Sequence, residues 1–492
     1  MKQDKNIEHY FEPFRKNTIG FDAQYESPYG KKSLVYADWI ASGRLYGPIE
    51  DKIKNEFGPF VANTHTETSE TGTRMTHAYH HAHHLIKDHV NANKNDVIIT
   101  QDSGMTRVIN KFQRILGLKV SGCLLGSKCV QSLERPVVFI THMEHHSNQT
   151  SWYETICDVV ILEPNKDLLV DPDDLRRKLE QYKDRKFKIG SFTAGSNVTG
   201  ITVPYHQLAR IMHEAGGLCF VDFAAAAPYV NIDMHPSDPM EKLDAIFFSP
   251  HKFLGGPGSS GVLIFDSSLY HRSAPDVPGG GTVAWTNPWG EYKYLDDIES
   301  REDGGTPGFL QAIRSALAIE LKNKMGVSNI KEREAELLKI VFSDLPKVPG
   351  IHILADNVPE RLGCVSFYID NIHYNLVVKL LSDRFGVQVR GGCACAGTYG
   401  HFLLHVSKEQ SKAITELINH GDLSTKPGWV RLSLHPTMTN NQLHFIIDAI
   451  KQIAINIREW EKDYRYDHHA NEFQHIRFDS GSQRILSQWF HL

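Results

Sequence analysis

The chain has 492 residues, of which 41% are hydrophobic and 23% charged, as in a soluble globular protein with room for two or three domains. Its 53 basic and 58 acidic side chains give a formal net charge of −5, which supports neither a nucleic-acid partner nor a membrane partner and favours a small-molecule substrate. Seven cysteines without framework spacing fit a reducing compartment. The first eight residues hold no apolar signal core and no run approaches the ~20 residues of a membrane span, so we expect a cytoplasmic protein.

The N-terminal part of the chain carries two features before any regular alternation begins. Residues 1–34 are polar and aromatic and are expected to form an arm, followed at Leu34–Gly43 by a short strand and a turn of small residues. A group of histidines then recurs at helical spacing, namely His77, His80, His81 and His84. Because no carboxylate or cysteine stands at a defined spacing from them, we favour a polar helix face over a metal site and predict no metal ligand.

Apolar strands and helical segments alternate from residue 96 to residue 222. The expected strands are Val97–Thr100, Val137–Thr141, Val159–Leu162, Lys188–Ala194 and one that ends at Asp222, and the expected helices begin near Gly104 or cover Asp173–Tyr182 and His206–Ala215. Such alternation predicts an α/β fold with a doubly wound, mostly parallel sheet and helices on both faces. Ligands then bind beyond the carboxyl ends of the strands.

Polar motifs follow several of these strands. Ser103–Thr106 opens a helix, where free amides and a threonine hydroxyl suit a phosphate, although a plain helix cap has the same pattern. Glu144–Asn148 places His145 after a strand, where an imidazole either is structural or stacks on an aromatic cofactor and shuttles protons. Ser196–Gly200 has the composition of an ordinary turn. The residues alone leave the first two alternatives open.

The segment Asp244–Asp266 contains a lysine in an unusual setting. Short apolar strands at Ala245–Phe248 and Val262–Phe265 enclose a glycine-rich loop with Lys252 at its tip. This amine is either a surface charge or is aimed into a pocket, since glycines let the backbone approach a ligand closely. Asp222 also ends an apolar strand, so one fold could present both a carboxylate and an amine at strand ends. Pyridoxal phosphate requires an acid for its pyridinium nitrogen and a lysine for a Schiff base.

The character of the chain changes near Lys331. Glycine turns at Pro278–Val283 and Asp303–Pro307 precede a long amphipathic helix expected from about Gly308. Beyond them, a smaller α+β domain is predicted from segments at Cys364–Asp370, Tyr374–Phe385, Val387–Arg390, Trp429–His435 and a helix from about Asn440. Cys393 and Cys395 in this domain are open to three interpretations: a metal site that lacks a second ligand pair, a buried unreactive pair, or a reactive thiolate.

Taken together, these motifs resemble the class V aminotransferase family. Asp222, Ser249-Pro-His-Lys252, Arg390-Gly-Gly-Cys-Ala-Cys395 and Trp429-Val-Arg431-Leu-Ser occur in the family's order, and the resemblance extends over roughly Val35–Ile453. The match is to the cysteine desulfurase and selenocysteine lyase branch. It implies a fold-type I enzyme that uses pyridoxal 5'-phosphate to remove sulfur from L-cysteine, which leaves alanine and a persulfide on the enzyme.

The resemblance also implies a role for each matching residue. Lys252 holds the cofactor and moves the α-proton of the substrate, His145 stacks on the cofactor ring, and Cys395, rather than Cys393, is the nucleophile. The substrate-binding residues are Ala41, Asn197 and Arg431. The cofactor-binding residues are Gly104, Met105, Thr106, His145, Asn197, Asp222, Ser249, His251, Lys252 and Thr282.

Two partners besides the amino acid substrate are implied. The family's glycine turn that matches Pro278–Val283 reaches the cofactor phosphate of a second subunit, so a homodimer is expected, and a sulfur-acceptor protein is possible. One position departs from the family, because Ala225 replaces a glutamine that donates a hydrogen bond to the phenolic oxygen of the cofactor. The alternative reactions are therefore transamination, racemisation and carbon–sulfur or carbon–selenium lysis, as in selenocysteine lyase.

A non-catalytic scaffold is the hypothesis from a different class. The joint retention of Lys252, Asp222, His145 and Arg431 argues against it. We divide the chain into an N-terminal arm (1–34), a large cofactor-binding domain (35–330), a small C-terminal domain (331–462) and a C-terminal tail (463–492). The segment 398–426 is longer than expected for compact bacterial desulfurases and is predicted to form a lid or an extra helix.

Overall fold

The computed structural model describes residues 6–101, 104–120, 134–478 and 481–491. Contacts divide the chain into two compact units, which we describe separately. The sheet unit comprises residues 17–19 and 40–331, and the C-terminal unit comprises residues 1–16, 20–39 and 332–492. The division into four parts made from the sequence remains a prediction.

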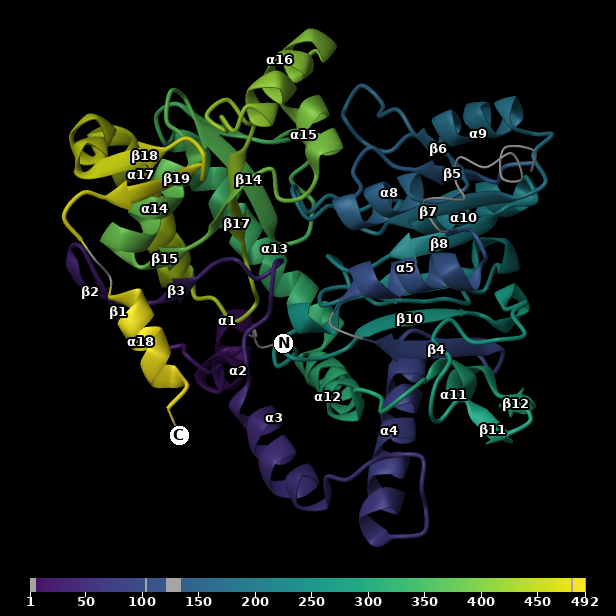
Figure 1. Ribbon diagram of the computed structural model, residues 1–492. Coiled ribbons are helices and arrows are strands. Elements are labelled where there is room, and N and C mark those ends of the chain that lie inside the picture. The colour runs from purple at the N-terminus through teal and green to yellow at the C-terminus, as the bar shows by residue number, and fades with distance from the viewer. Residues whose placement is uncertain (1–5, 102–103, 121–133, 479–480, 492) are drawn as a thin grey trace, which may run out of the picture. The chain divides into compact units, whose positions relative to one another are not determined.

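Seven strands form the centre of the sheet unit, in the order β4-β10-β9-β8-β7-β5-β6 (Figure 1). They are β4 (Asp96–Gln101), β5 (Val137–Ile140), β6 (Asp158–Ile161), β7 (Lys188–Thr193), β8 (Leu218–Asp222), β9 (Ala245–Phe248) and β10 (Gly261–Asp266). Strand β10 pairs antiparallel with both neighbours, whereas the pairings from β9 through β6 are parallel. The predicted α/β fold with a mostly parallel sheet is therefore confirmed.

Helices surround this sheet, and one of its cores lies under helix α5. The helices are α3 (Gly47–Lys52), α4 (Glu70–His89), α5 (Met105–Ile115), α8 (His146–Tyr153), α9 (Pro172–Gln181), α10 (Tyr205–Glu214), α11 (Ile298–Glu302) and α12 (Phe309–Met325). The ring of Phe112 in α5 lies 5.1 Å from that of Phe220 and 5.0 Å from that of Phe265. Successive strand residues point to opposite faces, so the strands supply alternate side chains to this core.

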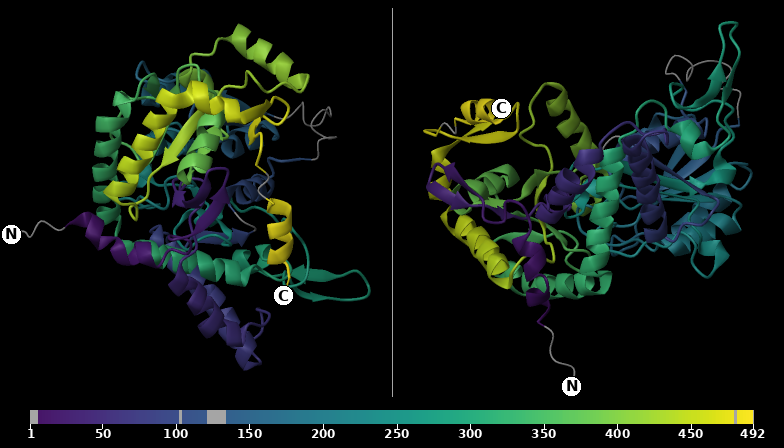
Figure 2. Two further views of the ribbon diagram at one scale, coloured as in Figure 1. Left: turned by 90° about the vertical axis from the view of Figure 1, so that its left-hand side faces the viewer. Right: turned by 90° about the horizontal axis from the view of Figure 1, so that it is seen from below.

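A hairpin extends away from the rest of the sheet unit (Figure 2). It consists of β11 (Val283–Thr286) and β12 (Tyr292–Tyr294), which pair antiparallel. On helix α4, the predicted polar histidines His77, His80, His81 and His84 are exposed. The buried histidine of this helix is His83, whose Nε2 lies 2.9 Å from the hydroxyl of Thr100.

The C-terminal unit contains a four-stranded antiparallel sheet in the order β13-β14-β17-β16. The strands are β13 (Ile351–Ile353), β14 (Cys364–Ile369), β16 (Arg390–Gly392) and β17 (Trp429–Ser433). Its long helices are α13 (Val327–Asp344), which begins in the sheet unit, α14 (Tyr374–Phe385) and α17 (Asn440–Trp460). This architecture agrees with the predicted α+β part of the chain.

The chain ends and the long insertion add further elements to the C-terminal unit. They are α1 (Ile7–Tyr10), α2 (Glu12–Lys16), β1 (Gln24–Ser27), β2 (Gly30–Ser33), β3 (Val35–Tyr36), β15 (Val387–Gln388), α15 (Gly397–Leu403), α16 (Lys408–Asn419), β18 (Tyr464–Asp467), β19 (Glu472–His475) and α18 (Ser482–Trp489). Strand β3, which directly follows the predicted N-terminal arm, pairs parallel with β15, far along the chain. Helices α15 and α16 lie almost entirely within residues 398–426, for which an extra helix or a lid is predicted.

Within the ranges described, no helix is both long and apolar enough to cross a bilayer. In the same part of the chain, His, Cys, Asp and Glu side chains form no group of three or more that is arranged to hold a metal ion.

Candidate active site

The loop after β9 presents Lys252 from a short helical turn, Pro250–Lys252. Ser249 is extended and buried, and its carbonyl oxygen accepts a hydrogen bond from the Lys252 amide at 3.1 Å. A Cβ atom on Gly256 would come within 1.8 Å of the Pro250 carbonyl oxygen. Glycine is therefore required beside the turn, and this close backbone packing holds the base of Lys252 in place.

The segment from Ala41 to Gly43 lies against the lysine turn. The Gly43 amide donates to the His251 carbonyl oxygen at 2.9 Å, and a Cβ atom on Gly43 would fall 1.9 Å from the Phe253 carbonyl oxygen. Burial and the charge of Lys252 lower the pKa of His251 to about 4, although a hydrogen bond with the Ala41 backbone opposes this shift. Ala41 and a neutral His251 therefore neighbour Lys252 near pH 7.

The start of helix α5 contacts the same turn. The Met105 amide donates to Oγ of Ser249 at 2.9 Å. Gly104 has a φ of +109°, and a Cβ atom there would lie 3.1 Å from Cε1 of His251, so a side chain would crowd that imidazole. The first amides of a helix have no acceptors within it, which makes the start of α5 suitable for a phosphate group.

A hydroxyl pair joins the starts of α5 and α8. Thr106 Oγ1 and Ser147 Oγ lie 2.7 Å apart. The Ser147 amide donates to Nδ1 of His145 at 3.1 Å, and His145 caps helix α8. An Nδ1 that accepts a hydrogen bond places the proton of a neutral imidazole on Nε2. Thr106 and His145 thus belong to one connected group, whereas Ser103 of the predicted phosphate turn lies outside the described residues.

Asp222 ends strand β8 and is buried. Its Oδ1 accepts a hydrogen bond from the Ala224 amide at 2.8 Å. Burial raises the pKa of Asp222 to about 6, while the Ala224 amide and the charge of Lys252 favour the ionised form. The structure therefore places the predicted amine and the predicted carboxylate within electrostatic reach of each other. Ala225, where the family has glutamine, is buried and its side chain cannot donate a hydrogen bond.

Asn197 and Thr282 are both buried, but they differ in their surroundings. Asn197 lies in the turn after β7, the neighbour of β8, and the Ala194 amide before this turn donates to the Asp222 carbonyl oxygen at 2.8 Å. The Thr282 hydroxyl instead donates within its own turn, to the Gly279 carbonyl oxygen at 2.7 Å. Asn197 thus lies at the same sheet edge as Asp222.

Glu144 has no role in the sequence-based prediction, yet it links three elements of this group. Its Oε1 accepts from the amide and hydroxyl of Thr141 at 3.2 and 2.7 Å and from the Thr193 amide at 2.8 Å. Its Oε2 accepts from Nδ2 of Asn148 at 2.7 Å. Burial raises the pKa of Glu144 to about 8 despite these donors. The motif in which Glu144 precedes the predicted ring-stacking histidine is visible in the sequence, but these partners are not.

Arg431 lies buried on β17 in the C-terminal unit and pairs with Asp38. Its Nη2 is 2.7 Å from Oδ1 of Asp38, and Nε of the half-exposed Arg390 is 3.0 Å from Oδ2 of the same carboxylate. Arg390 and Arg431 are also directly paired across β16 and β17. Asp38 therefore orients the predicted substrate-binding arginine, a role that its position just after a short strand does not reveal.

The two cysteines of the predicted nucleophile motif lie in a tight turn between β16 and α15. The Ala396 amide donates to the Cys393 carbonyl oxygen at 3.0 Å, and the central residues Ala394 and Cys395 have φ angles of +50° and +57°. Left-handed backbone at both central positions is the pattern of a type I′ turn. Both thiols are free, with Cys395 exposed and Cys393 partly exposed, so the interpretation as a buried thiol pair is wrong.

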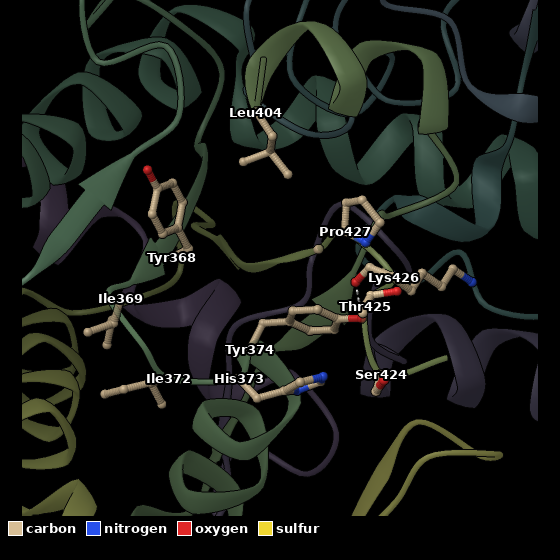
Figure 3. Close-up of a pocket in the computed structure, with 11 residues that line it drawn as sticks. Tyr368, Ile369, Ile372, His373, Tyr374, Leu404, Ser424, Thr425, Lys426 and Pro427 are labelled. Atoms are coloured by element: carbon tan, nitrogen blue, oxygen red, sulfur yellow. Dashed lines mark hydrogen bonds between the residues drawn. The ribbon is translucent and has the colours of Figure 1, made fainter. Parts of the chain in front are cut away.

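A cavity of about 270 Å³ lies near this turn in the C-terminal unit (Figure 3). Tyr374 in its wall donates from its hydroxyl to the Lys426 carbonyl oxygen at 3.2 Å. The Tyr374 ring would lie 2.5 Å from a Cβ atom on Gly428 and 3.2 Å from one on Gly391. None of the predicted site residues lines this cavity.

Residues 35–445 match the family described as Aminotransferase class-V. The chain has an α/β fold with a mostly parallel sheet, and the group around Lys252 lies at the edge of this sheet. The chain belongs to the class-V aminotransferase family.

Curated relatives cover most of the chain. A probable cysteine desulfurase from Halalkalibacterium halodurans is 27% identical over 371 residues, which cover 74% of this chain and 84% of the relative. A probable cysteine desulfurase from Methanothermobacter thermautotrophicus is 24% identical over 424 residues, which cover 85% of this chain and 94% of the relative.

Solved structures of cysteine desulfurases share the fold. The apo enzyme from Thermococcus onnurineus has a TM-score of 0.71 at 20% identity, and the comparison covers 90% of this chain and 98% of that one. CsdA from Escherichia coli has a TM-score of 0.68 at 22% identity, with 91% and 98% covered.

Proposed function

We propose that this protein is a pyridoxal-phosphate-dependent enzyme that converts L-cysteine to L-alanine and transfers the sulfur to Cys395. One observation carries the proposal: Lys252, the buried carboxylate of Asp222 and the start of helix α5 form one connected group in the sheet unit. Family membership and the names of the relatives support the same activity.

The residues of this group fit the cofactor. The amine of Lys252 would bind it covalently, and Asp222 would hold the proton on its pyridine nitrogen. Gly104 keeps the backbone close to His251, and the backbone amides at the start of α5 would receive the phosphate. The flat ring of His145 would serve the cofactor face, and its Nε2 would exchange protons. When bound, pyridoxal phosphate supplies an electron sink for charge at the α-carbon of an amino acid.

The residues of the chain would then perform three tasks. Arg431, oriented by Asp38, binds the substrate carboxylate with Asn197, in charge-assisted hydrogen bonds worth about 1.5–3 kcal/mol each. The Lys252 amine, once released, moves the α-proton. The Cys395 thiolate attacks the substrate sulfur, the carbon–sulfur bond breaks, and L-cysteine plus the Cys395 thiol become L-alanine plus a Cys395 persulfide.

Product analysis tests the reaction itself. Incubation with L-cysteine should give alanine in an amount equal to the sulfur recovered as persulfide and sulfide. Pyruvate or another keto acid in place of alanine would favour a lyase or an aminotransferase, and equal alanine formation by wild type and Cys395→Ala would favour a cleavage that needs no protein thiolate. The Cys395→Ala variant is the control, because it should bind the cofactor but form no alanine from cysteine.

Borohydride reduction tests the assignment of Lys252. The purified protein should be yellow, and reduction should fix the cofactor to the peptide that contains Lys252. The Lys252→Ala variant should lose this label. A label on a different lysine would overturn the assignment.

The same proposal extends to partners. We propose a homodimer in which the turn that contains Thr282 serves the cofactor phosphate of the second subunit, and a sulfur-acceptor protein that receives the persulfide. The cytoplasmic location expected from the sequence stays a prediction.

A further inference from the structure

The Cys393–Ala396 turn holds two thiols, although the proposed sulfur transfer uses one. Cys393 is the first residue after β16, and Cys395 is the second central residue of the turn. In so tight a turn the Cα atoms of residues i and i+2 are about 5.5 Å apart. A disulfide needs a Cα separation of about 4.4–6.8 Å, so the backbone permits a bond between these cysteines.

The Cys393 side of the turn is firmly anchored. A Cβ atom on Gly391 would lie 2.2 Å from Oδ1 of Asn375, and one on Gly428 would lie 3.0 Å from the Cα atom of Gly392. The backbone of β16 at Gly391 and Gly392 thus packs closely against Asn375 and Gly428, although a Cβ atom on Gly392 itself would meet nothing within 4 Å. Beyond it, Cys395 is exposed. An anchored thiol therefore stands next to an accessible one that is proposed to carry the sulfur.

The backbone of the turn is also strained. Ala394 and Cys395 are both left-handed, a conformation that is sterically unfavourable for a residue other than glycine. Such strain persists only where the surrounding structure imposes it, and it is concentrated at functional sites. A disulfide closed within so short a segment would itself be strained, and strained or exposed disulfides are the ones that thiols reduce easily.

We propose that Cys393 is the resolving thiol of this protein, which releases the sulfur of a Cys395 persulfide as hydrosulfide by forming a Cys393–Cys395 disulfide. The inference rests on the proposed persulfide at Cys395. The Cys393 thiolate attacks Sγ of Cys395, the bond between Sγ and the terminal sulfur breaks, and its electron pair leaves with hydrosulfide. The terminal sulfur is reduced, the two cysteines are oxidised, and no external oxidant is needed.

Two chemical factors favour this step. The attacking and leaving groups are joined by two residues, so the reaction is intramolecular and gains the entropic advantage of a preassembled pair. Hydrogen sulfide is a stronger acid than a cysteine thiol, and thiol–disulfide exchange is faster with the more acidic leaving group. A low-molecular-weight dithiol then reduces the disulfide and returns both cysteines to the thiol form.

Single-turnover mass spectrometry of the loaded enzyme tests the inference. The reduced protein is desalted, given one equivalent of L-cysteine without other thiols, and alkylated. The wild-type peptide with both cysteines should have lost two hydrogen atoms, with one hydrosulfide released for each disulfide, and dithiothreitol should reverse the change. The Cys393→Ser variant should instead retain one added sulfur on Cys395 and release hydrosulfide more slowly, on the order of 10-fold or more.

Other patterns in this experiment overturn the inference. Equal retention of sulfur on Cys395 in wild type and Cys393→Ser means that Cys393 does not resolve the persulfide. An added sulfur on Cys393 means that it relays sulfur and does not release it. Absence of alanine and of added sulfur in both proteins means that the proposed desulfuration has failed.

A second measurement separates the inference from the desulfuration. Wild-type protein is equilibrated in glutathione redox buffers without substrate and then alkylated. A resolving pair should form the Cys393–Cys395 disulfide, and the Cys393→Ser variant should retain glutathione on Cys395. If wild type also keeps glutathione on Cys395 and never closes the disulfide, the two thiols cannot react and the inference is wrong.

Discussion

Asp222 shows how one buried side chain constrains the chemistry of the sheet unit. Its carboxyl lies at the end of β8, accepts one backbone hydrogen bond, and interacts electrostatically with the charge of Lys252. Burial disfavours its ionised form until a positive group neutralises it. A protonated pyridine nitrogen is such a group, so Asp222 is suited to hold the cofactor that we propose.

The stability of the cofactor-free protein should therefore depend on the ionisation of Asp222. Its folded-state pKa of about 6 lies above the ordinary value of 3.8, so the folded state favours the neutral acid. The stabilisation is complete below about pH 4 and is lost as the pH rises to about 6, by about 3 kcal/mol in total. The free energies of unfolding of wild type and Asp222→Asn, measured by urea denaturation, should diverge by this amount across that interval.

Asp276→Asn is the matched control for this measurement. Burial tends to raise the pKa of Asp276, but a hydrogen bond from Arg114 and the charge of Lys111 lower it below its ordinary value. Its contribution to stability is present above about pH 4 and is lost only at lower pH. The difference in unfolding free energy between Asp276→Asn and wild type should therefore stay constant between pH 4 and 6. A similar constancy for Asp222→Asn would contradict the assigned environment of Asp222.

Arg431 is the residue whose substitution should alter substrate binding most directly. Arg431→Ala should raise KM for the amino acid roughly a hundredfold, because a lost carboxylate clamp is worth about 3 kcal/mol. Arg431→Lys keeps a positive charge beside Asp38 but loses the planar fork, so it should also raise KM while the melting temperature stays closer to wild type. Arg390→Ala removes the half-exposed partner of Asp38 and should change KM little. An unchanged KM in Arg431→Ala would show that the carboxylate is bound elsewhere.

At the scale of elements, helix α12 secures the turn that follows β8. Lys322 of this helix is buried, and its ammonium donates to the carbonyl oxygens of Ala227 and Val230 and lies 3.1 Å from Nε2 of His89 in α4. Lys322 thereby connects the segment after Asp222 to helices α12 and α4. The sequence analysis did not single out Lys322, because a lysine in an amphipathic helix is normally expected on the exposed face.

Replacement of Lys322 should change how stability depends on alkaline pH. Burial lowers the pKa of Lys322 to about 7 from an ordinary 10.5. The unfolded chain keeps the proton over this interval, so wild-type stability should rise with pH above 7, by about 1 kcal/mol per pH unit. Lys322→Met should lack this rise in denaturant midpoint. Lys324→Met, an exposed change on the same helix, should retain it, and an unaltered pH profile in Lys322→Met would refute the argument.

At the scale of the whole molecule, the β11–β12 hairpin is the feature that points to a second subunit. Trp289 at its tip is 83% exposed, and Trp285 and Tyr292 are also largely exposed. Exposed aromatic side chains that gather on one element are typical of an interaction site. The hairpin directly follows the turn that contains Thr282, which the family resemblance assigns to a subunit interface.

The wild-type protein should sediment with twice the mass of the chain, and Trp289→Ser should shift the equilibrium toward monomer. Trp489→Ser is the matched control, because Trp489 is 75% exposed on α18, far from the hairpin in the sequence. Analytical ultracentrifugation at several concentrations gives the dissociation constants. A monomeric wild type would rule out the dimer, and equal effects of both substitutions would remove the hairpin from the interface.

The pattern of apolar residues is sufficient to predict the sheet and the position of its lysine. Buried parallel strands are continuous apolar runs, so β9 at Ala245–Phe248 has the bounds predicted for it and the other strands lie close to theirs. Lys252 follows because the loop beyond such a strand lies at the ligand-binding edge of the sheet. Asp222 could be placed at a strand end for the same reason.

Contacts between residues distant in the chain become visible in the folded structure alone. Asp38 and Arg431 are 393 positions apart, and the Thr193 amide that donates to Glu144 is 49 positions from it, so no local pattern encodes either contact. The turn at Cys393–Ala396 contradicts local preference, because alanine and cysteine avoid left-handed backbone. Such a conformation persists where the surrounding fold maintains it, so the sequence could place the two thiols together but could not predict that they share a strained turn.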